Sequence, residues 1–261
     1  MVHLRPLPGA PGWASDLHAV EAAALADATA LAAGGVGAIM VENFHDVPFF
    51  PDTVPPVTIA AMTLLVGRIR DRFPQLPLGI NVLRNDAVAA LSIAAVTGAD
   101  FIRVNVHAGS VVTDQRLLHG QAESTLRRRN ELGCDVGILA DLRVKHARPL
   151  AERALGAEAA DLRERALADG LICSGTATGA TARPEELREV RETLPDCPLL
   201  VGSGMTAANV ADFAPWADGF IVGTSLKDPA GGPLSAINPE RVAAFVAAVQ
   251  ATSPGGEKES S

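Results

Sequence analysis

The sequence predicts an α/β fold, a single-domain (β/α)8 TIM barrel, on three observations. First, eight short apolar runs alternate with longer segments rich in Ala, Leu and Arg, the pattern of repeated strand–helix units around a parallel sheet. Second, eight such units fit within 261 residues, an ordinary size for this barrel. Third, polar residues follow several of the apolar runs, at the strand ends where barrel enzymes carry their active sites.

Each predicted strand is a short apolar run, and the strands cover residues 1–4, 38–43, 76–82, 101–106, 135–144, 171–175, 198–203 and 219–225. Each predicted helix fills the interval after a strand, and the helices cover residues 16–33, 57–72, 86–97, 115–132, 157–168, 184–193, 206–213 and 239–250. Four of the helices have start signals, at Asp16, at Asn85 or Asp86, at Pro184 and at Pro239.

The barrel domain is expected to span residues 1–252, followed by a disordered tail, 253–261, rich in Pro, Gly, Ser and Glu. A doubly wound open sheet is the alternative architecture. It calls for a glycine-rich turn after the first strand, and here the proline-containing stretch HLRPLPGAPGW follows instead.

Composition narrows the function classes. A net charge of −8 without a long Lys/Arg cluster argues against nucleic-acid binding. No apolar run approaches the roughly 20 residues of a membrane span, so no membrane insertion is expected. The start of the chain lacks the pattern of a secretion signal, and we expect a cytoplasmic protein. The three cysteines have no metal-site spacing and are interpreted as buried apolar residues.

The predicted strand ends are unusually polar. Their ionisable and amide residues, with the residues just after them, are His3, Glu42, Asn81, Arg103, Asn105, His107, Asp114, Asp141, Lys145 and His146. Alternation along a strand would place Asp141, Arg143 and Lys145 on one face, toward the barrel mouth. Charged groups rarely occupy such a place unless they are paired or used. The alternative interpretation is a structural network of ion pairs and hydrogen bonds that fills the barrel.

Small residues end the last two predicted strands, in VGSG and IVGTSLK. Glycine lets an anion approach the backbone, and a following helix start adds N–H donors, so these loops predict a phosphate site. A third small-residue loop, SGTATG, borders the same region. The predicted phosphate-binding residues are Gly175, Gly202, Ser203, Gly204, Gly223, Thr224 and Ser225.

The stretches MVHLRPLPGAPGW, VENFHDVPFF, GINVLRNDAVAAL, FIRVNVHAG, ADLRVKHARPL and DGFIVGTSLK together resemble the BtpA/SgcQ family, which is placed among the ribulose-phosphate-binding barrels. The resemblance implies a (β/α)8 barrel. It does not fix an activity, because the family name comes from photosystem I biogenesis while other members accompany carbohydrate-handling proteins. Two residues depart from the family pattern: His45 and Arg116 stand where the resemblance implies glycine. It also implies residues ahead of the first strand, so this chain would begin within that strand.

Asp141 is the first choice as general acid or base, because an adjacent lysine can tune its pKa. Lys145 would stabilise an oxyanion or form a Schiff base. Glu42 offers a second carboxylate, either for an acid/base pair or, with Asp141, for Mg²⁺ held jointly with substrate phosphate; no dedicated metal site is expected.

The remaining polar residues would contact the substrate. The histidines His3, His107 and His146 would polarise oxygens or exchange protons, with Arg103 beside them. Asn81, Asn105 and Asp114 would bind hydroxyl groups. The sequence shows no distinct pocket for a flavin or pyridoxal phosphate.

The pattern favours an enzyme acting on a phosphorylated sugar or nucleoside-like small molecule, and it leaves lyase, glycosidase and isomerase chemistry open. The alternative is a non-catalytic BtpA-like assembly factor for a photosystem I-type membrane complex. A homo-oligomer is expected, and the loop 45–56, with Phe49 and Phe50, would serve as a lid or a dimer contact.

Overall fold

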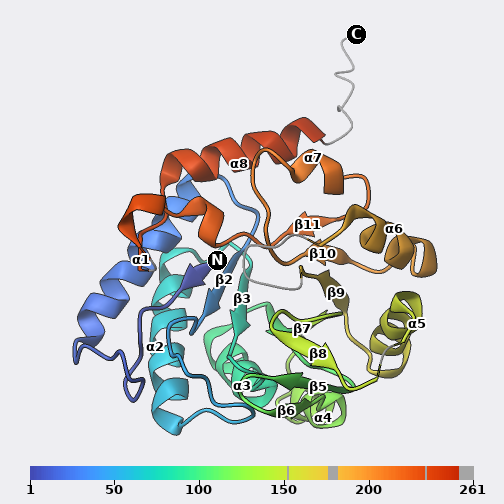
Figure 1. Cartoon of the computed structure of the whole chain (residues 1–261). Helices are drawn as coiled ribbons and strands as arrows, with labels where there is room; N and C mark the ends of the chain where they lie inside the picture. The colour runs from blue at the N-terminus through green and yellow to red at the C-terminus, as the bar shows by residue number, and fades with distance from the viewer. Residues whose placement is uncertain (152, 176–181, 233, 253–261) are drawn as a thin grey trace.

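The computed structural model describes residues 1–151, 153–175, 182–232 and 234–252, and its centre is one curled parallel sheet (Figure 1). In spatial order the strands are β1 (Val2–His3), β2 (Ile39–Glu42), β3 (Leu78–Asn81), β4 (Phe101–Val104), β7 (Gly137–Asp141), β9 (Gly170–Cys173), β10 (Leu199–Val201) and β11 (Gly219–Phe220). The sheet curls until its first and last strands, β1 and β11, come together. The terminal nitrogen of Met1, directly before β1, donates a hydrogen bond of 2.8 Å to the carbonyl of Val222, just after β11. The predicted fold class is confirmed.

Helices surround the sheet, as Figure 1 shows. They are α1 (Leu17–Ala33), α2 (Pro56–Arg72), α3 (Ala87–Thr97), α4 (Ala122–Glu131), α5 (Leu155–Ala160), α6 (Pro184–Thr193), α7 (Val210–Phe213) and α8 (Pro239–Thr252). Asp16 and Asp86 cap α1 and α3, each accepting a hydrogen bond of 2.9 Å from a backbone N–H in the first turn. Pro184 and Pro239 are the first residues of α6 and α8, as predicted.

Three single-turn segments complete the elements. A π-helical turn, Asp161–Arg165, continues α5, and 3-10 turns cover Thr224–Leu226 and Pro229–Gly231. The helix predicted over 206–213 is reduced to its last four residues, α7. The predicted tail 253–261 lies outside the described residues.

A second sheet, which the sequence analysis did not predict, lies beside the barrel mouth. Its strands are β5 (Ser110–Thr113), β6 (Leu117–His119) and β8 (Ala147–Pro149), and β5 pairs antiparallel with both of the others. The predicted helix 115–132 is therefore wrong at its start, and the predicted strand 135–144 ends at Asp141. The physical reason is that the loops after β4 and β7 satisfy their backbone groups by pairing with each other.

The strands bury their apolar side chains against the helices, as the alternation in 101–106 predicts. Ile102 and Val104 are almost fully buried in this core. Within the described ranges, no helix is both long and apolar enough to cross a membrane.

The amino-terminal ends of the strands form a lower rim where arginine and aspartate side chains tie helices to strands. The arginines lie in the last turns of α2, α4 and α6, and the aspartates come directly before β4, β9 and β11. The pairs are Arg70 with Asp100 at 2.5 Å, Arg129 with Asp169 at 2.6 Å, and Arg191 with Asp218 at 2.6 Å. We call these three pairs the lower clasps.

Each lower clasp makes several hydrogen bonds besides its ion pair, although Arg70 Nε has no partner among the described residues. Its aspartate also accepts the backbone N–H at the start of the neighbouring strand, from Leu78, Ile138 and Leu199 respectively. Its arginine also donates to backbone carbonyls; Arg191, for example, reaches the carbonyls of Pro195, Cys197 and Trp216. The lower clasps therefore have hydrogen-bond partners within the fold itself.

Candidate functional site

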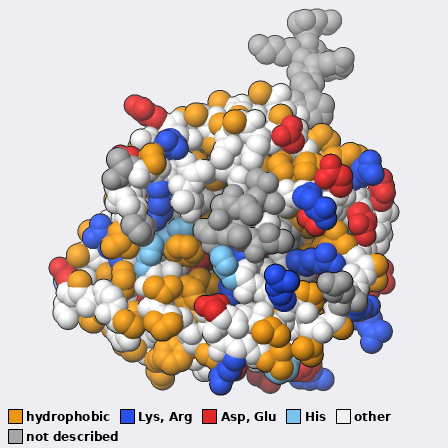
Figure 2. All heavy atoms as spheres, in the orientation of Figure 1, with side chains coloured by type: hydrophobic (Ala, Val, Ile, Leu, Met, Phe, Trp, Pro, Cys, Tyr) orange, Lys and Arg blue, Asp and Glu red, His pale blue; other side chains and the backbone are white. Residues whose placement is uncertain are grey.

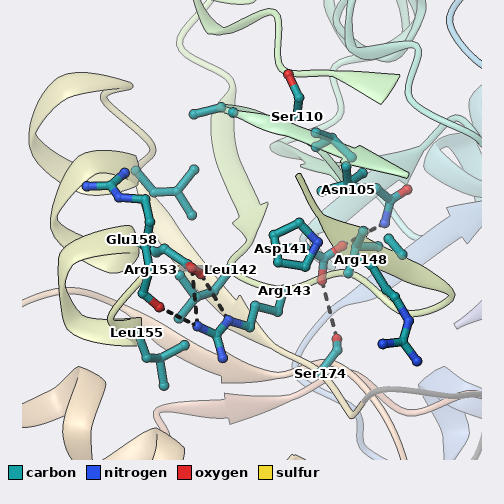
Figure 3. A pocket seen from close by; sticks show the side chains of 18 of the residues that line it. Asn105, Ser110, Asp141, Leu142, Arg143, Arg148, Arg153, Leu155, Glu158 and Ser174 are labelled. Carbon is teal, nitrogen blue, oxygen red and sulfur yellow. Dashed lines mark hydrogen bonds and ion pairs between the residues drawn. The ribbon is translucent and has the colours of Figure 1, made fainter. Parts of the chain in front are cut away.

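The carboxyl ends of the strands form the opposite rim, the mouth, and Asp141 at the end of β7 lies in a closed network there (Figure 3). Arg103 of β4 donates Nε to Asp141 Oδ2 at 3.0 Å and Nη2 to Oδ1 at 2.9 Å. Asn105 Nδ2 donates to Oδ2 at 2.6 Å, and Ser174 Oγ donates to Oδ1 at 3.3 Å. The Asp141 side chain is 0% exposed and that of Arg103 is 8% exposed.

This geometry gives Asp141 little capacity for proton transfer. Each of its two oxygens already accepts two hydrogen bonds, one of them from a guanidinium. Burial would lower the pKa of Arg103, but the Asp141 carboxylate raises it. For this pair, the structural network offered as the alternative describes the arrangement, and Asp141 fits the role of a residue that positions Arg103 and Asn105.

The orientation of the Asn105 amide follows from the same network. Only its NH₂ group can face the Asp141 carboxylate, so Oδ1 must point the other way. Asn105 Oδ1 is buried and has no hydrogen-bond partner within the described part of the chain. A buried acceptor without a donor is costly, so this oxygen suits a hydroxyl group of a bound molecule.

Glu42, at the end of β2, is the other buried carboxylate of the mouth. Asn81 lies opposite it on β3 and donates Nδ2 to Glu42 Oε2 at 3.0 Å, while His3 is its neighbour on β1. Glu42 Oε1 makes no hydrogen bond to the described residues. Unlike Asp141, Glu42 keeps an oxygen available for proton exchange with a ligand.

Lys145 follows β7 in a turn, and its half-buried ammonium lies near both carboxylates. Burial lowers its pKa, and the charge of Arg103 lowers it further, whereas Glu42 and Asp141 oppose this shift. The predicted common strand face of Asp141, Arg143 and Lys145 is wrong, because the strand ends at Asp141. Arg143 instead turns outward and pairs with Glu158 of α5 at 2.9 Å.

Arg84, which the sequence analysis did not select, also belongs to the mouth. It lies three residues past the end of β3, is 8% exposed, and donates Nη2 to the Lys145 carbonyl at 2.6 Å. Burial lowers its pKa, and Asp141, Asp114 and Glu42 oppose that shift. The signal in the sequence was an arginine directly after a strand end, in GINVLRND.

On the β1–β2 side of the mouth, aromatic and basic side chains pack together. His3 stacks on Phe44 with ring centroids 4.3 Å apart, and His45 meets both rings edge-on. Burial lowers the pKa of His45 to about 4, and nearby Lys227 adds to this effect. Burial also places the pKa of His3 well below its ordinary value. Both imidazoles are therefore neutral near neutral pH, and Figure 2 shows histidine side chains at the surface of this face.

Lys227, a second residue that the analysis missed, is 7% exposed just after the turn that follows β11. Burial lowers its pKa, and Asp27 opposes that shift. Among the described residues, its ammonium has neither a hydrogen bond nor an ion pair. A buried cation is costly unless an anion compensates it.

The loops after β10 and β11 lie side by side, as the predicted phosphate site requires. Their strands pair in parallel, and Ser225 Oγ donates to the Met205 carbonyl at 2.6 Å. Gly204 has a φ of 71°, a left-handed conformation that favours glycine. Gly223 is needed for a different reason: a Cβ there would meet His3 at 2.7 Å.

Free backbone donors line both loops. Within the described part of the chain, the N–H groups of Gly204, Met205, Gly223 and Thr224 make no hydrogen bond. Ser203 is buried, and its Oγ accepts the Gly175 N–H at 2.9 Å. A Cβ on Gly202 would meet Ser174 Oγ at 2.5 Å, so this strand end packs tightly against the Asp141 network.

Three predicted site residues lie off the ends of the strands, and two of them still border the site: His146 lines the cavity beside Asp141, and the charge of Asp114 acts on Arg84. His107 is buried with Nε2 at 2.9 Å from the Ala166 carbonyl, on the side facing the π-helical turn. Asp114 is exposed in the turn between β5 and β6, and His146 is exposed with a φ of 55° before β8. The unpredicted small sheet accounts for the positions of the last two.

A cavity of about 1260 Å³ opens between the small sheet, α5 and α6. Asn105, Asp141 and Ser174 form its inner end (Figure 3), whereas Glu42 and Gly223 are not among its lining residues. No group of three or more His, Cys, Asp or Glu residues is arranged as a metal site in the described ranges. Because the oxygens of Asp141 are already bonded, Glu42 and Asp141 do not fit the Mg²⁺ site considered from the sequence.

The amino-acid sequence of this chain matches a known protein family along nearly its whole length. The BtpA family model matches residues 1–251. The photosystem I biogenesis protein BtpA of Synechocystis sp. is 48% identical over 249 residues, which cover 95% of this chain and 86% of that protein. The chain therefore belongs to the BtpA family, and the resemblance is confirmed.

Two solved structures show the same fold at low sequence identity. Thiamine phosphate pyrophosphorylase from Pyrococcus furiosus has a TM-score of 0.58 at 13% identity, covering 87% of this chain and 90% of that one. Orotidine 5′-phosphate decarboxylase from Pyrococcus horikoshii has a TM-score of 0.54 at 17% identity. The match covers 89% of this chain and 94% of that one.

Proposed function

We propose that this member of the BtpA family is an enzyme that acts on a phosphorylated sugar or nucleoside-like small molecule by acid/base catalysis at the mouth. The observation that carries the proposal is the pair of adjacent loops after β10 and β11. Their backbone N–H groups make no bond to the described residues, and the buried Lys227, which follows the second loop, has no ion pair with those residues. The names of both structural neighbours refer to phosphate-bearing compounds, which supports it.

The phosphate would bind to the free N–H groups of Gly204, Met205, Gly223 and Thr224. Backbone donors at strand ends and turn starts bind anions without a side-chain entropy cost. Lys227 supplies the charge, since phosphate would compensate its buried ammonium. The hydroxyl of Thr224 adds a neutral donor.

The proton chemistry falls to Glu42, on the other side of the mouth, because it has an unbonded oxygen. The half-buried ammonium of Lys145, which lies near Glu42, would stabilise an oxyanion. In this proposal Asp141 positions Arg103 and Asn105, and Asn105 Oδ1 accepts a substrate hydroxyl. A carboxylate for proton transfer and a nearby cation serve lyase, glycosidase and isomerase reactions alike, so the reaction type stays open.

The second candidate function is a non-catalytic assembly factor, favoured by the name of the relative that is 48% identical. A factor of this kind could retain the phosphate loops and bind a metabolite without turning it over. The two candidates differ in proton chemistry, which can be measured directly.

The test has a binding arm and an exchange arm. Titration calorimetry should detect ribose 5-phosphate but not ribose, and Lys227→Met should weaken ribose 5-phosphate binding by about tenfold. Arg188→Gln, on the outer face of α6, is the control and should bind as the unmodified protein does. Equal binding of ribose and ribose 5-phosphate would refute the phosphate site.

Proton NMR in heavy water then separates enzyme from binding protein. With ribulose 5-phosphate, carbon-bound hydrogens next to the carbonyl should exchange for deuterium, and Glu42→Gln should slow this by at least about a hundredfold. Binding without exchange across ribose, ribulose and fructose phosphates would favour the assembly factor.

A further inference from the structure

Arg84 uses fewer of its donors than Arg103 at the mouth or Arg191 at the lower rim. Its guanidinium makes one hydrogen bond, to the Lys145 carbonyl, and no ion pair within the described ranges. Arg103 by contrast holds a carboxylate with two bonds, and Arg191 bonds three carbonyls and an aspartate. No Arg84 nitrogen is among the buried atoms without a partner, so its unused donors are open to the mouth and available to an acceptor that enters it.

Two cations lie together at this point of the mouth. Arg84 donates a hydrogen bond to the backbone carbonyl of Lys145, so the two side chains start close together. Burial lowers the pKa of Lys145, and the positive charge of Arg84 lowers it as well. Glu42, Asp141 and the exposed Asp114 are the nearby carboxylates, but none of them has a recorded ion pair with Arg84 or Lys145. Glu42 is bonded to Asn81, and both oxygens of Asp141 are bonded within its own network. Like charges held close in a low-dielectric site need an anion between them.

The position of this pair is separate from the phosphate loops. Arg84 follows β3 and Lys145 follows β7, whereas the loops with free N–H groups follow β10 and β11. In the sheet order, β3 and β7 are separated from β10 on one side by β9 and from β11 on the other by β1 and β2. A ligand anchored at the phosphate loops would therefore present its far end to Arg84 and Lys145.

We infer that Arg84 and Lys145 bind a second anionic group of the substrate, a carboxylate or a phosphate, at the end opposite the phosphate held by the β10 and β11 loops. This inference rests on the proposed function and narrows it to substrates with two anionic ends. A planar guanidinium pairs with both kinds of group in a bidentate geometry. Arg103 is already paired with Asp141 through two hydrogen bonds and is not assigned to this second anion.

Matched ligands that differ only at the far end test the inference. Sorbitol 6-phosphate and 6-phosphogluconate have the same chain length and differ in an alcohol against a carboxylate. Glycerol 3-phosphate and 3-phosphoglycerate form a shorter pair, and fructose 6-phosphate against fructose 1,6-bisphosphate tests a second phosphate. In titration calorimetry, at least one doubly anionic ligand should bind about tenfold or more tightly than its partner.

Two variants assign the preference to its residues. Arg84→Gln and Lys145→Gln should each abolish most of the preference while keeping the affinity for the singly anionic ligand. Lys145→Gln secures the test if Arg84→Gln fails to fold, because the Lys145 side chain makes no hydrogen bond to the described residues. Arg148→Gln, an exposed arginine on β8, is the matched control and should retain the preference.

The outcomes are distinct. If sorbitol 6-phosphate and its counterparts bind but no doubly anionic ligand is preferred, the inference fails and the proposed phosphate site stands. If the preference survives both variants, the second anion binds elsewhere and the assignment is overturned. If none of the six ligands binds, both the proposed function and the inference that rests on it are refuted.

Discussion

The two rims of this barrel use the same charged residue types in opposite ways. At the lower rim, the lower clasps pair every arginine with an aspartate, and carbonyls and strand N–H groups occupy the remaining positions. At the mouth, Arg84, Lys145 and Lys227 are buried or half-buried without an ion-pair partner among the described residues. The lower-rim arginines each have an ion-pair partner, whereas these three mouth cations have carboxylates nearby but no direct ion pair among the described residues.

This difference separates residues that hold the fold from residues available to a ligand. Charged groups that find all their partners within the chain contribute to stability, as expected for the amino-terminal face of a barrel. Buried cations without partners cost stability and persist where a ligand compensates them. The Arg103–Asp141 pair lies at the mouth, but it belongs with the charged groups that hold the fold, because each partner is bonded within the chain.

The largest effect on stability is expected from breaking the Arg103–Asp141 pair. This substitution tests whether the pair holds the fold. Asp141→Asn should lower the free energy of unfolding by about 3–5 kcal/mol, because it leaves the Arg103 charge buried and unpaired. Urea denaturation measures this loss. The double variant Arg103→Met with Asp141→Leu should recover part of it. A fully stable Asp141→Asn protein that has only lost ligand binding would instead make Asp141 a functional carboxylate.

A smaller effect is expected at the lower rim, and it sharpens the contrast. Arg191→Gln should reduce the free energy of unfolding by about 1–2 kcal/mol, since the half-exposed clasp loses several hydrogen bonds to solvent. Ribose 5-phosphate binding should not change. A loss of affinity without a loss of stability would contradict the assignment of this rim to the fold.

The smallest effect concerns pH. His45 has a folded pKa of about 4 against an ordinary value of 6.5, so between these values the unfolded chain binds a proton that the native protein does not. Stability should therefore fall as pH falls through this window, and His45→Asn should lose less than the unmodified protein. His18→Asn, exposed on α1, is the control and should follow the unmodified protein in urea denaturation series.

Much of the fold followed from local patterns. Eight apolar runs and capping residues such as Asp16 and Asp86 are local signals, and the structure confirms them. The small sheet was missed because its strands pair across an interval of roughly 30 residues between loops, and each strand alone is too short to show a pattern. Gly109, Gly120 and Pro149 mark its boundaries only in retrospect.

The site was partly predictable for the same reason. Strand-end position selected Glu42, Asn81 and the glycine loops, whose neighbourhood follows from the barrel itself. It could not show that Asp141 would be saturated by Arg103, because that depends on side-chain geometry across two strands. Arg84 and Lys227 were missed since they lie past the strand ends, where a sequence does not show which way a side chain points.

The contrast between the rims is tested most directly by locating a bound oxyanion. A crystal soaked in tungstate, a phosphate analogue with a strong anomalous signal, should show a peak within hydrogen-bond distance of the Gly204 and Gly223 N–H groups and near Lys227. Tungstate found only at surface arginines, with the mouth empty at saturating concentration, would contradict the account.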